Sequence, residues 1–179
     1  MELFYAEGIG AVGVDTLVER AGVSKPTLYT QFGSKEGLVA AVLDRRRERR
    51  QRALTAFLES STDDPKEKLL SVFEWVALDQ DRTGSRGCAF INAAVELPDP
   101  NHPGRAVIAE YKEWLRATLS TLAAEAGLSD PEGMGHALLL LIDGAHARIL
   151  VTGDPEEMTR SRSTANSLLS HTTTSTPGG

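Results

Sequence analysis

The sequence of 179 residues predicts an all-α protein, and three observations support this. Apolar residues recur at i, i+3 and i+4 spacing in segment after segment, as in Leu69, Val72, Phe73 and Val76, and this is the period of one helix face. No stretch shows sustained polar and apolar alternation rich in β-branched residues, which is typical of a strand. Most prolines fall between the periodic segments, where they end helices.

The N-terminal segment is expected to form three short helices and one long one. These are Met1–Glu7, Val14–Arg20, Lys25–Gln31 and a helix that begins after Ser34. Ser24 can cap the third helix, with Pro26 in the first turn, where a missing N–H is tolerated. Two short helices joined by a tight turn that contains Gly22 indicate a helix-turn-helix.

The remainder of the chain is expected to form longer helices at 66–82, 87–97, 104–127, 134–151 and 155–169. The helices at 87–97 and 134–151 are apolar on more than one face, so they must be buried on two sides. The tail has too little apolar content to fold. The predicted domains are therefore residues 1–45 and 46–170, with a disordered tail at 171–179.

Charge and composition exclude several classes of protein. Residues 1–56 carry nine basic and seven acidic side chains and the rest carries ten and eighteen, so the charge permits local nucleic-acid contact at the N-terminal end but does not demand it. A single cysteine, Cys88, excludes an internal disulfide framework and suggests a reducing compartment. Without a basic n-region or an apolar run longer than Ala137–Ile142, we expect a cytoplasmic protein without a membrane partner.

Other motifs are interpreted as structural. Gly8–Gly13 spells GxGxxG, but helix rather than strand precedes it, so it is expected to be a turn. The basic run Arg45–Arg52 is expected to be a solvated helix face. Cys88 is expected to be a small buried apolar group, and the scattered histidines predict no metal site. We expect no cofactor and no enzymatic activity.

One continuous stretch, LFYAEGIGAVGVDTLVERAGVSKPTLYTQFGSKEGLVAAVL, carries the elements LF-x₃-G, AGVS-x-x-TLY-x-x-F and SKE-x-L. It resembles the DNA-binding domain of the TetR family of transcriptional regulators. More loosely, RGCAFINAAVEL and LLLIDGAHARILVTGDPE resemble that family's sixth and eighth helices. The resemblance implies an N-terminal three-helix helix-turn-helix domain followed by a helical ligand-binding and dimerisation domain.

The segment Lys25–Gln31 is then the expected recognition helix, with Leu28 and Phe32 facing inward. Lys25 is suited to guanine O6 and N7, and Gln31 to adenine. Thr27 suits a thymine methyl group or a phosphate. The resemblance implies phosphate contacts by Tyr29 and Lys35. The full expected DNA-binding set is Thr16, Lys25, Pro26, Thr27, Tyr29, Thr30, Gln31 and Lys35.

The resemblance also implies an effector pocket and a dimer interface made by the helices 134–151 and 155–169. The bulky and polar candidates for the pocket are Trp75, Phe90, Ile91, Asn92, Glu96, Tyr111 and Trp114. The candidates for the interface are Leu138, Ile142, Gly144, Ala145, Ile149, Ala165 and Leu168.

Together these features predict a one-component transcriptional regulator. We expect a repressor that binds a palindromic double-stranded operator as a homodimer and is released by a small molecule. Gly13 stands where the family usually has a capping serine or threonine, and the family's first helix usually begins upstream of Met1. The alternative is therefore a helical small-molecule-binding or dimerisation protein with little DNA affinity because its first helix is incomplete.

Overall fold

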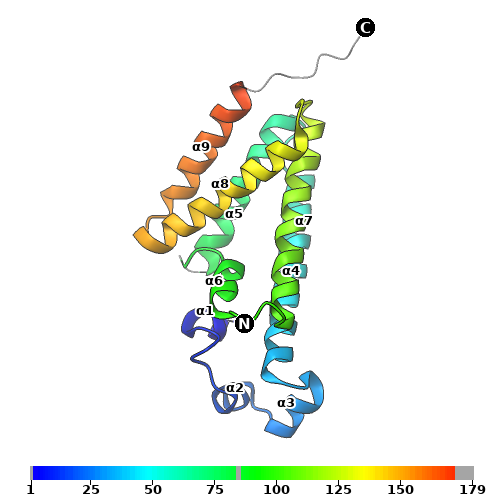
Figure 1. Ribbon diagram of the computed structural model, residues 1–179. Coiled ribbons are helices and arrows are strands. Elements are labelled where there is room, and N and C mark those ends of the chain that lie inside the picture. The colour runs from blue at the N-terminus through cyan, green and yellow to red at the C-terminus, as the bar shows by residue number, and fades with distance from the viewer. Residues whose placement is uncertain (1, 84–85, 172–179) are drawn as a thin grey trace. The chain divides into compact units, whose positions relative to one another are not determined.

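The structure, a computed structural model, describes residues 2–83 and 86–171, and these residues form nine helices and no strand (Figure 1). The all-α prediction is confirmed. The last helix continues to His171, so one residue of the predicted tail is helical. The remainder of that tail, residues 172–179, lies outside the described residues.

Contacts divide the chain into two compact units. The first unit is Met1–Gln51 with Ala89–Tyr111, and the second is Arg52–Cys88 with Lys112–Gly179. This division does not follow chain order, because residues 89–111 group with the N-terminal segment. The domain boundaries predicted after residues 45 and 170 stay predictions.

The first unit contains short helices with clear capping signals. Its helices are α1 (Glu2–Glu7), α2 (Val14–Ala21), α3 (Lys25–Phe32), the start of α4 (Lys35–Glu59), α6 (Ala89–Glu96) and the start of α7 (Pro103–Glu125). The hydroxyl of Ser24 accepts a bond from the N–H of Thr27 at 3.2 Å, and that of Ser34 accepts one from the N–H of Gly37 at 3.0 Å. The predicted cap at Ser24 is confirmed and Ser34 caps α4 in the same way, whereas Gly13 offers α2 no side-chain cap.

The core of the first unit includes the loop between α1 and α2. Ile9 and Val12 lie in this loop and are both buried, alongside Phe4 of α1 and Leu43 of α4. Burying an aliphatic side chain of this size contributes about 1.5–3 kcal/mol. The loop is therefore fixed by its own apolar side chains.

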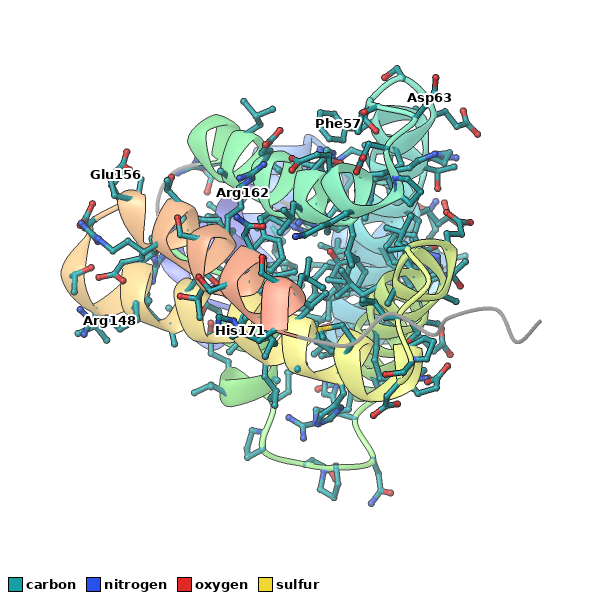
Figure 2. All side chains as sticks on the ribbon, turned by 90° about the horizontal axis from the view of Figure 1, so that it is seen from above. Phe57, Asp63, Arg148, Glu156, Arg162 and His171 are labelled. Atoms are coloured by element: carbon teal, nitrogen blue, oxygen red, sulfur yellow. The ribbon has the colours of Figure 1, made fainter. Side chains whose placement is uncertain are left out.

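The second unit is built from longer helices. They are the end of α4, α5 (Pro65–Thr83), the end of α7, α8 (Pro131–Thr152) and α9 (Glu156–His171), and α9 packs against both α5 and α8. Arg162 of α9 lies beside α5 (Figure 2), with its guanidinium 3.1 Å from Glu67 and 3.0 Å from Glu74. A Cβ on Gly135 would come within 2.7 Å of the backbone nitrogen of Ser120, so α8 approaches α7 closely there.

Helix α8 is the most apolar part of the second unit. Among the described residues, it is the one helix long and apolar enough to cross a membrane, a test that core helices of soluble proteins also pass. Seven of its residues are buried within the chain, so packing accounts for part of its apolar composition. Cys88, in the same unit, is also buried, which confirms the prediction made for it.

Candidate nucleic-acid interface

Helices α2 and α3 pack against each other as a helix-turn-helix whose turn is at Gly22. Gly22 has φ +66° and ψ +31°, and its N–H donates to the carbonyl of Glu19 at 3.2 Å. The N–H of Val23 donates to the carbonyl of Val18 at 3.1 Å. Glycine adopts this left-handed conformation without the strain that a Cβ would add, so the turn ends α2 and lets α3 begin.

Helix α3 presents a polar surface over one buried side chain. Leu28 is 5 % exposed, which confirms its predicted inward position, whereas Phe32 is only half-buried. Thr16 and Lys35 are also half-buried. The exposed members of the expected DNA-binding set are Lys25, Pro26, Thr27, Tyr29, Thr30 and Gln31.

The two hydroxyl groups at the start of α3 are bonded to each other. The Oγ of Ser24 lies 2.8 Å from the Oγ1 of Thr27, in addition to its bond with the Thr27 N–H. Either hydroxyl can be the donor of this bond, so Thr27 can still donate to a phosphate as well as present its methyl group to a thymine. Both predicted roles of Thr27 stay predictions.

Lys25 forms an ion pair that the sequence did not indicate. Its Nζ lies 2.6 Å from a carboxylate oxygen of Asp15, in the first turn of α2. Hydrogen bonding to this carboxylate, and then its negative charge, raise the pKa of Lys25 above its ordinary value. An acidic residue in a first helical turn is common, so the residue type alone gave no sign of a partner on α3.

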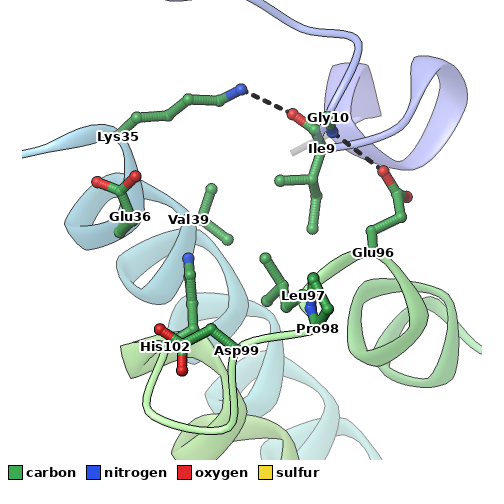
Figure 3. Close-up of a pocket in the computed structure, with 10 residues that line it drawn as sticks. All are labelled: Ile9, Gly10, Lys35, Glu36, Val39, Glu96, Leu97, Pro98, Asp99 and His102. Carbon is green, nitrogen blue, oxygen red and sulfur yellow. Dashed lines mark hydrogen bonds between the residues drawn. The ribbon is translucent and has the colours of Figure 1, made fainter.

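Two polar side chains hold the loop between α1 and α2, as Figure 3 shows. The Nζ of Lys35 donates to the carbonyl of Ile9 at 2.9 Å, and the N–H of Gly10 donates to the carboxylate of Glu96 at 3.1 Å. The stretch Gly8–Gly13 lies in this loop and follows a helix, so its prediction as a turn is confirmed. Lys35, predicted to contact a phosphate, is thus bonded to the protein backbone in this structure.

A cavity of about 230 Å³ lies beside this loop. Glu36 stands in its wall, and bonds from its own backbone N–H and from Ser34 lower the pKa of its carboxyl group. The cavity wall therefore combines polar side chains with apolar ones. Its lining residues are Ile9, Gly10, Lys35, Glu36, Val39, Glu96, Leu97, Pro98, Asp99 and His102.

The residues predicted for an effector pocket are divided between the two units. Phe90 and Tyr111 stack with ring centroids 4.1 Å apart, and the Nε of Arg50 donates to the Tyr111 hydroxyl at 2.8 Å. Ile91 and Asn92 are half-buried in the same unit, whereas the exposed Glu96 is bonded to the loop. In the second unit, Trp75 is buried and Trp114 is half-buried.

The basic run on α4 is only in part the solvated face that was predicted. Arg45, Arg49 and Arg52 are exposed, but Arg46 and Arg50 are 6 % and 8 % exposed and lie four positions apart, so they share the inner face of the helix. The Arg46 guanidinium lies 5.3 Å from the ring centroid of Tyr5. The prediction was wrong for these two arginines because charge alone does not show which face a neighbouring aromatic ring covers.

Five of the seven predicted interface residues lie in the core of the single chain. Their burial assigns them to packing within the chain and corrects their placement at a subunit interface; they are Leu138, Ile142, Ala145, Ile149 and Ala165. Gly144 and Leu168 are exposed, as predicted residues of a contact surface should be. On α8 the exposed positions that share one side of the helix are His136, Leu140, Gly144, Ala147, Arg148 and Val151.

Comparisons with known proteins agree with this architecture. Residues 1–42 match the family model described as bacterial regulatory proteins, tetR family, and residues 65–165 match one described as tetracyclin repressor-like, C-terminal domain. The crystal structure of a TetR-family transcriptional regulator from Streptomyces coelicolor is similar, with 33 % sequence identity and a TM-score of 0.85. That similarity covers 94 % of this chain and 89 % of the other.

Two curated relatives match over short segments. The HTH-type transcriptional repressor ComR of Escherichia coli is 51 % identical over 45 residues, and the HTH-type transcriptional activator FasR of Mycolicibacterium smegmatis is 42 % identical over 62. These segments are 25 % and 35 % of this chain, and they span only 21 % and 28 % of the relatives. With both family models and the full-length structural similarity, the chain belongs to the TetR family of bacterial transcriptional regulators.

Proposed function

We propose that this regulator is a repressor that binds a palindromic operator as a homodimer in the cytoplasm and is released by a small-molecule effector. The observation that carries the proposal is α3, a helix of eight residues with polar side chains outward and Leu28 anchored inward. A helix of this kind fits the major groove of B-DNA. Two-fold symmetry of the protein requires near two-fold symmetry in the DNA.

The side chains of the proposed DNA interface divide into base-reading and phosphate-binding groups. We assign Lys25 to guanine O6 and N7, Gln31 to adenine and Thr27 to a thymine methyl group. Tyr29 is assigned to a phosphate, as is Lys35 once it leaves the Ile9 carbonyl. The remaining members of the proposed interface are Thr16, Pro26 and Thr30.

Release by an effector is proposed as a shift between two conformations of the dimer, only one of which places both α3 helices in successive grooves. The stacked pair Phe90 and Tyr111 is buried, with each residue 1 % exposed, so an effector would reach these rings only in the released conformation. The two curated relatives are a repressor and an activator by name. Transcription from an operator-bearing promoter, measured with and without the protein, decides whether the protein represses or activates.

Selection from a random-sequence duplex library with the purified chain tests the proposal. We expect enrichment of a near-palindrome whose half-site centres lie one helical turn, about 34–36 Å, or more apart. Lys25→Ala is expected to weaken operator binding by about 5- to 150-fold and to relax preference at one base pair of each half-site. Enrichment of no symmetric motif contradicts the proposal and favours a small-molecule-binding protein with little DNA affinity.

The proposed phosphate contact of Lys35 has a separate test. We expect Lys35→Ala to weaken binding to all duplexes alike and to reduce the slope of log Kobs against log salt by about one unit, because one phosphate contact is lost. Glu96→Gln is the control, since it weakens the other bond to the same loop without removing a cation. An unchanged slope in a folded Lys35→Ala protein removes Lys35 from the phosphate contacts.

A further inference from the structure

The ion pair between Asp15 and Lys25 joins the two helices of the helix-turn-helix at the proposed DNA-reading surface. Lys25 is the first residue of α3, and the first turn of α3 contains no acidic residue. A cation at that end of a helix is disfavoured by the helix dipole. The negative charge that pairs with Lys25 comes instead from Asp15 of α2, whose carboxylate oxygen lies 2.6 Å from the Lys25 Nζ. The side chains of Lys25 and Asp15 are 51 % and 82 % exposed.

This exposure makes the pair available for exchange. Exposed ion pairs contribute little to stability, so the ammonium can leave Asp15 without unfolding the domain. The Asp15 carboxylate stays on the same surface, however, and it repels any phosphate that approaches the ammonium closely. The pair thus changes which DNA groups can attract Lys25.

The two kinds of DNA contact respond differently to this carboxylate. Binding to arbitrary DNA depends on phosphates, whose charge the carboxylate opposes. A guanine edge offers neutral acceptors to Lys25. The amino group of the paired cytosine can donate a hydrogen bond to a carboxylate. A correctly positioned G·C pair therefore offsets the cost of placing Asp15 at the DNA, whereas a phosphate does not.

We propose that Asp15 is a specificity-determining residue, whose carboxylate withholds the Lys25 ammonium from backbone phosphates and leaves it available to a guanine. This inference rests on the proposed function of α3. Asp15 acts through Lys25 and, at the operator, on the base pair that Lys25 reads. Its role is to reduce binding to other DNA more than binding to the operator.

The test compares Asp15→Asn with the unchanged chain on two duplexes, the symmetric sequence obtained by selection and a shuffled sequence of the same length and composition. Asp15→Asn is expected to bind the shuffled duplex several-fold more tightly, with a salt slope steeper by about one unit, because Lys25 gains a phosphate. The ratio of the affinity for the symmetric duplex to the affinity for the shuffled duplex should fall. Asp15→Glu, which keeps the charge, should preserve the ratio.

Two controls isolate the role of Lys25. Glu19→Gln removes one negative charge from another exposed position of α2, and it should leave the ratio unchanged. In a Lys25→Ala background, Asp15→Asn should change the ratio much less than it does when Lys25 is present. Equal melting temperatures of the variants would show that folding is preserved.

Three results overturn the inference. They are an unchanged ratio in Asp15→Asn, an equal change in Glu19→Gln, or a full effect that persists without Lys25. In each case the unchanged chain still recognises its symmetric duplex, so the proposed function survives. If the unchanged chain selects no symmetric duplex at all, the proposed function fails and this inference fails with it.

Discussion

Ile149→Asp is expected to unfold the second unit or to leave it without a cooperative thermal transition. Ile149 is fully buried on α8, so the substitution loses apolar burial and places an unpaired carboxylate in the core. Changes of this kind cost about 4–5 kcal/mol or more, a large part of the 5–15 kcal/mol that stabilises a typical domain. Circular dichroism during heating should show a melting temperature lowered by about 10 °C or more.

The matched control for this prediction is Ile149→Val, which keeps the shape and polarity of the site. It should cost only about 0.5–1.5 kcal/mol, because one methylene group is lost. If Ile149→Asp melted at the same temperature as the unchanged chain, Ile149 could not lie in the core of the folded chain. Its assignment to packing within the second unit would then be withdrawn.

The positions of the helices could be predicted because their signals are local. Ser24 and Pro26 mark the start of α3 within three residues, and the φ of +66° at Gly22 is one that glycine supplies most readily. The apolar period likewise depends only on neighbours in sequence. These signals predict the helix-turn-helix and the inward position of Leu28 without any tertiary contact.

The outward face of α8 could not be predicted in the same way. The helix is apolar on both sides, so its sequence does not say which side the chain covers. Helix α9 packs against α8, and a hydroxyl bond from Ser161 to the carbonyl of Leu141 at 2.9 Å joins the two. With this packing Ile142 is buried, while Leu140, two residues earlier, is 61 % exposed.

The polar contacts of the proposed interface also depend on long-range pairing. Lys35 meets the carbonyl of Ile9 across 26 positions, and Glu96 meets Gly10 across 86. No periodicity relates such positions. The charge of Arg50 likewise does not predict its hydrogen bond to Tyr111, 61 positions away. The sequence therefore identified the residue types at the interface but not their partners in the free protein.

Leu140→Asp is expected to give a folded monomer. Leu140 lies on the exposed face of α8 with Gly144, Ala147 and Val151, at spacings that share one side of a helix, and small residues there permit close approach of a second helix. In the proposed dimer a carboxylate on this face must lose its hydration, whereas in the monomer it stays in water.

The dimer dissociation constant of Leu140→Asp should rise by about a hundredfold or more, because two-fold symmetry places the change in both subunits. Sedimentation measures the constant, and an unchanged melting transition at monomer concentrations shows that the fold is kept. Leu78→Asp is the control, since Leu78 is 51 % exposed on a different helix, α5. Operator affinity should fall as dimerisation is lost, because only a dimer engages both half-sites. Unchanged dimerisation in Leu140→Asp would show that the subunits meet through another surface.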